Sequence, residues 1–292
     1  MDHTIVILGG GYGGMTAVAH LLEDLPDHVK IILVDRLPFQ GLKTEYYALA
    51  AGSIAETDIR VQFPKDNRVE IRYGEVTDIL LTEKLIQLAD QDPLEYDSLI
   101  IGLGCVDKYH NVPGADLYTQ SIQSLPSTRQ TYQAVNNIEP YGQITIVGGG
   151  LSGVEMASEL REARPDLNIR IIDRGSGVLT YSPIRLQKFV QDWFEEHDVK
   201  IVPNTSVTKV EPGIIFTEEG QLRSDEIVWT AGIQPNLLVQ GLDLDKDNQV
   251  QDFRYPRVIN ETKNKGNRLL RFSSLILRGK PLGFNRSNSE VY

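Results

Sequence analysis

The sequence predicts an α/β protein with two similar halves. An apolar run at 4–8, TIVIL, precedes the glycine cluster GGGYGG and an apolar-periodic segment at 15–25. The same succession returns 139 residues later, with QITIV at 143–147, then GGGLSG, then a helical segment at 154–164. Unbroken runs rich in β-branched residues are typical of strands buried on both faces of a parallel sheet. Each half is therefore expected to open with a strand, a tight turn and a helix.

The first glycine cluster has the spacing G-x-G-x-x-G, formed by Gly9, Gly11 and Gly14. In this pattern the first glycine allows the turn, the second lets the backbone approach a pyrophosphate, and the third lets helix and strand pack closely. The next expected strand, 29–34, is followed by Asp35, 21 residues after Gly14. An acid there can bind an adenosine ribose. The combination predicts a Rossmann-like nucleotide site, and a βαβ turn without a nucleotide is the alternative.

The second cluster repeats this spacing with Gly148, Gly150 and Gly153, and the strand at 169–172 ends before Asp173. We therefore expect two Rossmann-like dinucleotide-binding domains, the second inserted into the first. The predicted boundaries are 1–112 for the first part of one dinucleotide-binding domain, 113–234 for the second domain and 235–250 for an incomplete return to the first. Two such motifs imply two bound dinucleotides, or one bound dinucleotide and a decayed copy of the motif. Two bound dinucleotides would suggest that electrons pass from one to the other.

The remaining elements of the first half follow from periodicity and turn residues. After Gly41 we expect a short helix, and Gly74 interrupts an alternating strand. The candidates for lining a cofactor site in this segment are Lys43, Tyr46 and Tyr47. The alternative is that they belong only to a surface loop followed by a packed helix. The expected segments are a helix at 45–51, a strand at 69–79, a hairpin at 80–88 around Glu83 and Lys84, and a buried strand at 96–104.

In the second half, NVPG at 111–114 is expected to be a crossover turn, and Ser127 is expected to cap a helix at 127–138. A helix at 182–196 has Ser182 as its expected N-cap and Pro183 in its first turn. Its apolar stripe is interpreted as core: Leu186, Phe189, Val190, Trp193 and Phe194. Strands are expected at 199–202, 207–210, 214–217 and 227–232, the last corresponding in position to 99–104.

Composition excludes several classes of function. The net charge of −11 argues against nucleic acid as a partner and against unaided binding to anionic lipid. The first strand begins at residue 4, so we expect no signal peptide, and no apolar run approaches the roughly 18 residues of a membrane span. The single cysteine, Cys105, excludes an internal disulfide and fits a cytoplasmic protein. No metal site is predicted.

These motifs together resemble the two-dinucleotide flavoprotein reductases. YGEVTDI, YDSLIIGLG and IVWTAGIQPN resemble their linking segments. LKTEYYALAAG, LSGVEMASELRE and WTAGIQPN most resemble the type II NADH dehydrogenases, in particular the NADH dehydrogenase-like proteins of bacilli. The resemblance covers roughly residues 1 to 249. Relatives that use a cysteine pair or a redox cysteine beside the flavin are set aside, because 39–47 contains no cysteine.

The resemblance implies FAD and NADH as cofactors, with a membrane quinone as electron acceptor. FAD would bind at Gly9, Gly11, Gly14 and Asp35, with Val76 near the adenine and Lys43 and Gly104 near the flavin. Arg36 and Gly232 are also counted among the cofactor-binding residues. NADH would bind at Gly148, Gly150, Gly153 and Asp173. Asp173 favours NADH because a carboxylate repels a 2′-phosphate, while Arg174 leaves NADPH open. Glu155 would position the nicotinamide, unless it serves only the helix dipole.

The sequence departs from the family after residue 249. No Gly-Asp dipeptide occurs anywhere, although the family uses one to bind the ribityl-phosphate part of FAD. We likewise expect this sequence to form neither the quinone-contacting helix nor the C-terminal membrane-binding helices of the family. The segment 251–292 is instead basic, with a net charge of +6 against −17 for the residues before it. We interpret it as a truncated or frame-shifted end; the alternative is a membrane-contact tail with Leu269, Leu270, Phe272, Leu275 and Ile276 as its apolar patch.

Three functions therefore compete. The first is an FAD-dependent NADH dehydrogenase that reduces a quinone, cytoplasmic or peripheral on the cytoplasmic membrane face, with a homodimer left open. The second is a soluble NAD(P)H-dependent flavoprotein reductase that serves a ferredoxin-like protein. The third is an inactive relative without a complete flavin site. For an incomplete sheet we expect an exposed edge strand and poor solubility.

Overall fold

The computed structural model describes residues 3–240, 242, 258–261 and 267–271. Its contacts divide the chain into two compact units. The first contains the described residues of Met1–Gln40, Gln62–Gly104 and Asn236–Tyr292, and the second consists of Gly41–Val61 and Cys105–Pro235. The domain boundaries predicted from the sequence, after residues 112 and 234, stay predictions.

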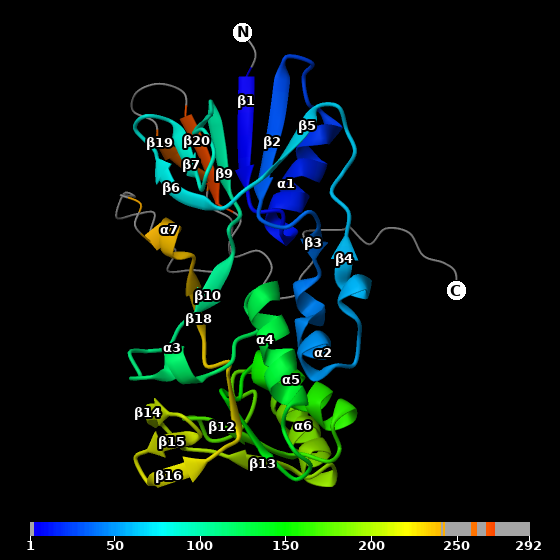
Figure 1. The fold of residues 1–292 in the computed structure, drawn as a ribbon, viewed down its shortest axis with the longest axis vertical. Helices are drawn as coiled ribbons and strands as arrows, with labels where there is room; N and C mark the ends of the chain where they lie inside the picture. Colours follow the sequence, from blue (N-terminus) through cyan, green and yellow to red (C-terminus); the bar gives the residue numbers. More distant parts are fainter. Residues whose placement is uncertain (1–2, 241, 243–257, 262–266, 272–292) are drawn as a thin grey trace, which may run out of the picture. The chain divides into compact units, whose positions relative to one another are not determined.

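The first unit is built on a mixed sheet whose strands run in the order β19-β20-β9-β1-β2-β5 (Figure 1). The four strands from β9 to β5 are parallel. The elements are β1 (His3–Leu8), α1 (Tyr12–Glu23), β2 (Val29–Asp35), β5 (Val69–Tyr73), β6 (Val76–Leu80), β7 (Leu85–Leu88), β8 (Leu94–Glu95), β9 (Ser98–Ile101), α7 (Leu237–Gln240), β19 (Val258–Glu261) and β20 (Asn267–Arg271).

Both faces of this sheet are covered, as the unbroken apolar strands require. On one face, Ala17 and Val18 of α1 pack with Ile7 and Leu33. On the other face, the small antiparallel sheet β6-β7-β8 packs against the alternate residues of the parallel strands, whose side chains point to that face. The central strand β1 is fully enclosed at its carboxyl end, where Leu8 is 0% exposed. The glycine turn therefore starts from a rigid, buried strand.

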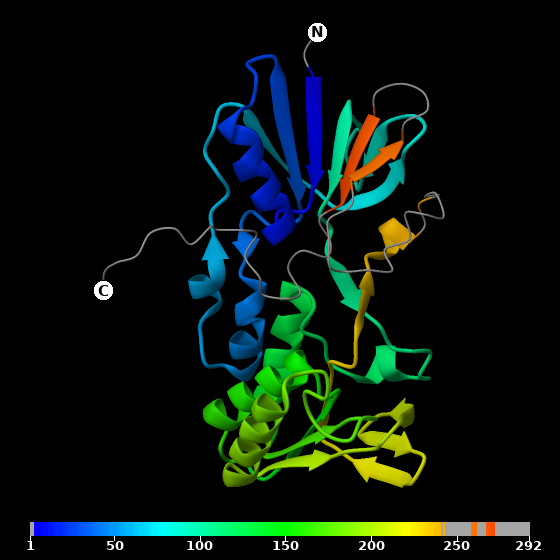
Figure 2. The same ribbon diagram turned by 180° about the vertical axis from the view of Figure 1, so that it is seen from behind.

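The second unit repeats this plan with a parallel sheet in the order β13-β12-β11-β17 and a three-stranded sheet β14-β15-β16. In Figure 2 the green helices and the yellow strands β14–β16 lie on different sides of this unit. Its elements are η1 (Lys43–Glu45), α2 (Tyr46–Ala51), η2 (Glu56–Ile59), β4 (Arg60–Val61), β10 (Cys105–Asp107), α3 (Ala115–Tyr118), α4 (Leu125–Asn136), β11 (Gln143–Val147), α5 (Leu151–Ala163), β12 (Asn168–Ile172), α6 (Ile184–Glu196), β13 (Val199–Val202), β14 (Val207–Glu211), β15 (Ile214–Thr217), β16 (Gly220–Arg223), β17 (Glu226–Trp229) and β18 (Ile233–Pro235); β3 (Gln40–Gly41) precedes η1.

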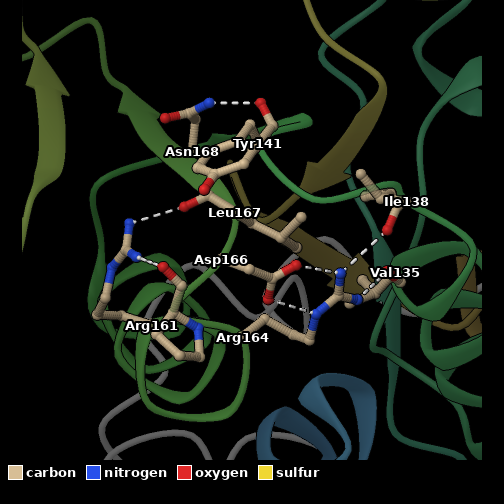
Figure 3. Close-up of polar contacts among 9 residues, drawn as sticks. Val135, Ile138, Tyr141, Arg161, Arg164, Asp166, Leu167 and Asn168 are labelled. Carbon is tan, nitrogen blue, oxygen red and sulfur yellow. Dashed lines mark hydrogen bonds and ion pairs between the residues drawn. The ribbon is translucent and has the colours of Figure 1, made fainter.

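The helix α5 is fixed at its far end by two arginines (Figure 3). Arg164 pairs with Asp166 and donates to the carbonyl oxygens of Val135 at 2.8 Å and Ile138 at 3.0 Å. Arg161 donates to the carbonyl oxygen of Leu167 at 3.0 Å. These bonds satisfy backbone carbonyls at the end of α4 and in the loop after α5. They hold α5 in place, and this is the helix that the second glycine turn opens.

Most predicted elements are confirmed, but several details are wrong. Ser127 does not cap its helix, because α4 begins at Leu125 and Ser124 Oγ accepts from the Ser127 N–H at 3.2 Å. Ser182 does not cap α6, whose N-cap is Pro183. The stripe on α6 is not all core, because Phe194 is 0% exposed whereas Phe189 is 66% exposed.

The segment predicted as one strand at 69–79 is two strands in different sheets. β5 pairs with β2 in the large sheet, and β6 pairs with β7 in the small one. Gly74 lies between them, and its N–H donates to the Asp35 carbonyl oxygen at 3.0 Å. The change of direction at Gly74 therefore carries the chain from one layer to the other.

The exposed edge strand expected for an incomplete sheet stays a prediction. β20 pairs in parallel with β9, in the register Leu269 with Leu99, so β9 is not an edge strand. Of the proposed apolar patch, Leu269 and Leu270 lie in β20, whereas Phe272, Leu275 and Ile276 lie outside the described residues. In the second unit the corresponding strand, β17, has a bridge to Gln120 beside it.

Candidate dinucleotide-binding sites

The first glycine turn joins β1 to α1 within the first unit. Gly9 has a backbone φ of +94°, a value that residues other than glycine rarely adopt, so the turn depends on this residue. A Cβ on Gly14 would lie 1.8 Å from the Gly9 carbonyl oxygen, so this glycine is needed for close packing of α1. By contrast, a Cβ on Gly11 would meet nothing within 4 Å. The open position is the one at which a pyrophosphate is expected to approach the backbone.

The acid after β2 is tied to this turn. One oxygen of the Asp35 carboxylate accepts from the Gly10 N–H at 2.6 Å, and the other accepts from the Leu37 N–H at 2.7 Å. Each carboxylate oxygen can accept more than one hydrogen bond, so Asp35 keeps capacity for ribose hydroxyls. Phe63, 8% exposed, lies against the turn, because a Cβ on Gly10 would be 2.5 Å from its ring. No sequence pattern had pointed to Phe63.

The second turn joins β11 to α5 and has the same geometry. Gly148 has φ of +115°. A Cβ on Gly153 would lie 1.8 Å from the Gly148 carbonyl oxygen, and one on Gly150 would meet nothing within 4 Å. Asp173 accepts from the Gly149 N–H at 2.6 Å and the Gly175 N–H at 2.6 Å. The strand, turn, helix and acid predicted from the second motif are therefore assembled as in the first.

The start of each helix fits an anionic group. Gly11 and Gly150 are the N-cap residues, and neither helix has a side-chain cap within the described part of the chain. The first helical bonds are donated by the N–H groups of Met15 and Val154. Backbone N–H groups in the first turn of a helix have no partner within the helix, so they can donate to a ligand or to water. Backbone donors and the helix dipole at this position favour a phosphate.

Three other predicted FAD-site residues also belong to the first unit. Val76 begins β6 and packs at the margin of its core. Arg36 is exposed and lies 3.6 Å from Glu75. The Gly104 carbonyl oxygen accepts from the Asn236 N–H at 3.3 Å. The structure thus brings the three fingerprint glycines and Asp35 together. Arg36 directly follows Asp35, Val76 follows the Arg36 partner Glu75, and Gly104 follows the backbone at Gly102 and Leu103 that lies against Gly9.

Lys43 belongs to the second unit, in a small polar cluster. Its ammonium donates to Gln123 Oε1 at 2.7 Å and to Cys105 Sγ at 3.5 Å. Ser121 donates to Asp107 in the same region, and burial raises the pKa of the Asp107 carboxyl above its usual range. Cys105 is half-buried, and its thiol contacts the Lys43 ammonium group. Gln123, Ser121 and Asp107 were not singled out from the sequence.

Glu155 lies in the first two turns of α5 and contacts Tyr47 of α2. Burial raises the pKa of the Glu155 carboxyl, and a hydrogen bond from Tyr47 opposes that rise. Tyr47 also donates to Ser152 Oγ at 3.0 Å. Gly232 directly follows Ala231, whose backbone lies against Gly148, and its carbonyl oxygen accepts from the Lys108 N–H at 3.0 Å. The two residues predicted to be catalytic therefore lie in different surroundings, Lys43 beside Gln123 and Cys105 and Glu155 beside Tyr47.

Comparisons with known proteins agree with this geometry. The family model described as pyridine nucleotide-disulphide oxidoreductase matches residues 3–258. The chain belongs to this family. NADH dehydrogenase-like protein YutJ of Bacillus subtilis (strain 168) is 52% identical over 246 residues, which cover 84% of this chain and 69% of YutJ. This match places the chain with the NADH dehydrogenase-like members of the family and confirms the resemblance found in the sequence.

More distant relatives have the same fold. Type II NADH:quinone oxidoreductase of Haemophilus influenzae is 25% identical over 303 residues, covering 84% of this chain and 68% of that protein. The structure of NDH2 from Plasmodium falciparum in complex with NADH has a TM-score of 0.71 at 20% identity, covering 82% of this chain and 57% of that one. The α/β fold with two dinucleotide-binding units is confirmed. The chain spans about two thirds of its curated relatives and little more than half of this solved chain.

Within the residues that the structure describes, no helix is long and apolar enough to cross a membrane.

Proposed function

We propose that this chain carries the FAD and NADH sites of an oxidoreductase that oxidises NADH and reduces a quinone. The observation that supports this most strongly is the repeated turn, with an open central glycine and a clamped acid in each unit. Two such turns accommodate two different dinucleotides. The relatives named NADH dehydrogenase-like protein and type II NADH:quinone oxidoreductase supply the reaction class.

The proposed residues divide between the two cofactors. Gly9, Gly11 and Gly14 hold the FAD pyrophosphate and Asp35 the adenosine ribose, with Arg36, Val76, Gly104 and Lys43 as further contacts. Gly148, Gly150, Gly153 and Asp173 hold NADH, with Gly232 nearby in its unit and Glu155 as a positioning residue. When bound, FAD supplies the chemistry of accepting a hydride from NADH and passing electrons to an acceptor.

The chain itself contributes binding and orientation. The helix termini at Gly11 and Gly150 offer backbone donors to the two pyrophosphates. Asp35 and Asp173 are already oriented by backbone N–H groups, so little ordering is needed when a ribose binds. The carboxylate of Asp173 disfavours a 2′-phosphate, which supports NADH over NADPH.

The proposal also covers location and assembly. We infer a cytoplasmic protein that meets a membrane quinone at the membrane surface, because membrane quinones dissolve in lipid. A homodimer is compatible with the proposal but is not required by either glycine turn.

A second candidate is a nucleotide-binding relative that does not retain flavin. The observation that favours it is the lack of any Gly-Asp dipeptide in the sequence. In this case the second turn would still bind NADH, because all of its parts lie within Gly41–Val61 and Cys105–Pro235.

Reduction of a water-soluble quinone by NADH tests the leading proposal. The purified chain, incubated with FAD and freed of excess cofactor, is expected to consume NADH and quinone in equal amounts. G150A serves as the matched control, because it should keep FAD and lose NADH-dependent reduction. A chain that binds NADH but never retains FAD would favour the second candidate.

A further inference from the structure

The helix α6 has one covered side and one exposed side. Phe194 is 0% exposed, and Val190 and Trp193 pack beside it on the core of the second unit. On the other side, Ile184 is 78% exposed and Phe189 is 66% exposed. Apolar side chains that are exposed together on one element are typical of contact surfaces. Within the described residues, this side of α6 is uncovered.

A stripe of exposed side chains runs along this side of the helix. Arg185, Phe189, Asp192 and Glu196 follow one another at intervals of four, three and four residues, and all four are exposed. This spacing places side chains on one face of a helix. The stripe begins with a positive charge, continues with an aromatic ring and ends with two negative charges. Its two ends therefore have opposite charge.

The order of the charges is unfavourable for the helix by itself. The start of a helix carries a partial positive charge and its end a partial negative charge, so cations are disfavoured at the start and anions at the end. α6 nevertheless has Arg185 and Lys188 near its start and Glu195 and Glu196 at its end. In the part of the chain that the structure describes, none of these four side chains has an ion pair. A neighbouring helix of opposite direction would satisfy all four.

We propose that the exposed side of α6 is an interface between two copies of this chain, whose α6 helices pack antiparallel about a twofold axis. Arg185 of each copy then lies opposite Glu196 of the other, so the same pair forms twice. The two Phe189 rings lie near the axis, where each covers apolar surface of the other copy. The antiparallel arrangement also places the positive end of each helix beside the negative end of the other.

The inference goes beyond the proposed function, which leaves a homodimer open and names no surface for it. α6 has 13 residues and is therefore about 20 Å long. Stable interfaces bury about 800 Å² on each partner, more than one short helix offers. We therefore expect a weak dimer with a dissociation constant in the micromolar range. Salt should weaken it further, because ions in solution screen exposed charge pairs.

Sedimentation velocity of the full chain, from nanomolar to high micromolar concentration, tests the proposal without requiring a bound cofactor. The wild type should pass from monomer to dimer as the concentration rises. R185E and E196R each replace two attractions by two repulsions, so the dissociation constant should rise at least about 10-fold in each. The double variant R185E/E196R exchanges the two charges, so it should restore the wild-type dimer.

E218R is the matched control for E196R, because Glu218 is exposed in the turn before β16 of the same unit and the change in charge is the same. It should dimerise like the wild type. F189S should weaken the dimer without changing the charge. Far-UV circular dichroism checks the fold, and recovery in the double variant shows that a single variant lost its partner and not its fold.

Three results would overturn the proposal. A wild type that stays monomeric at every concentration would mean that this side of α6 does not bind a second copy. A dimer that R185E and E196R leave unchanged would have its interface elsewhere. A double variant no more dimeric than the single variants would show that Arg185 and Glu196 do not face each other.

Discussion

The first and second glycine turns place the same three groups in the same positions, but the rest of each unit supports them differently. In both, one glycine is open, one is crowded, and an acid accepts two backbone N–H groups. Around the first turn, the ring of Phe63 lies against Gly10. Around the second, Thr230 hydrogen-bonds the carbonyl oxygens of Val147 at 3.0 Å and Gly148 at 3.1 Å. The shared parts are those that a pyrophosphate and a ribose require, and the differing parts only hold the turn in place.

This comparison predicts its largest effect at the crowded glycines. In G14A and G153A the new methyl group would meet a backbone oxygen at 1.8 Å, and backbone cannot yield as a side chain does. Each variant should lose about 3 kcal/mol or more of unfolding free energy in its own unit. Urea denaturation measures the loss. A variant as stable as the wild type would show that the helix does not pack on its strand as described.

The open glycines should separate binding from stability. G11A and G150A change a position with nothing within 4 Å, so each should cost less than about 1 kcal/mol of stability. The methyl group would instead occupy the approach to the pyrophosphate, and binding should weaken at least about 100-fold. Equilibrium dialysis with FAD and fluorescence titration with NADH measure the two affinities. G11A should lose FAD alone and G150A NADH alone; the reverse assignment would exchange the roles of the two units.

The acids should give a smaller, parallel effect. In D35N and D173N the amide keeps one acceptor oxygen but cannot accept from both N–H groups, and a hydrogen bond to a charged group contributes about 2 kcal/mol. Affinity for the dinucleotide of that unit should fall about 10- to 30-fold. D173N should also lose part of its preference for NADH over NADPH. An unchanged preference would mean that Asp173 does not face the ribose.

The smallest effect concerns only the second unit, where an ion pair between Glu56 and Arg129 joins η2 to α4. Glu56 lies between Arg129 and Arg60, whose hydrogen bonds and charges lower its pKa to about 2. A depressed pKa means that this stabilisation is present above about pH 4.5 and is lost as the pH falls toward 2. E56Q should lose about 1 kcal/mol at pH 7. Thermal unfolding over this pH range should show the difference from the wild type shrinking on acidification, and a constant gap would contradict it.

Local sequence patterns predicted what the two units have in common. The glycine spacing and the acid at the end of the next strand identify both turns, because the βαβ unit places those residues together without help from the rest of the chain. β11, β13 and β15 also have their predicted bounds, since each is a short apolar run between turn residues. The family was equally accessible, because its motifs are local.

What the sequence did not reveal depends on packing between distant segments. Phe63 is 54 residues beyond Gly9, and no pattern connects the two. Tyr47 was a candidate, but its pairing with Ser152 requires α2 to lie on α5. The exposed face of α6 was misjudged because an amphipathic helix shows which side is apolar, not how much of it the protein covers.

The central claim is that the first turn holds FAD and the second presents NADH to it. The most direct measurement is the visible absorbance spectrum of the purified chain, with FAD supplied, before and after NADH is added without oxygen. The account predicts a bound flavin that bleaches with NADH in the wild type and stays oxidised in G150A. A colourless protein after incubation with FAD, or a flavin that NADH leaves unchanged, would contradict it.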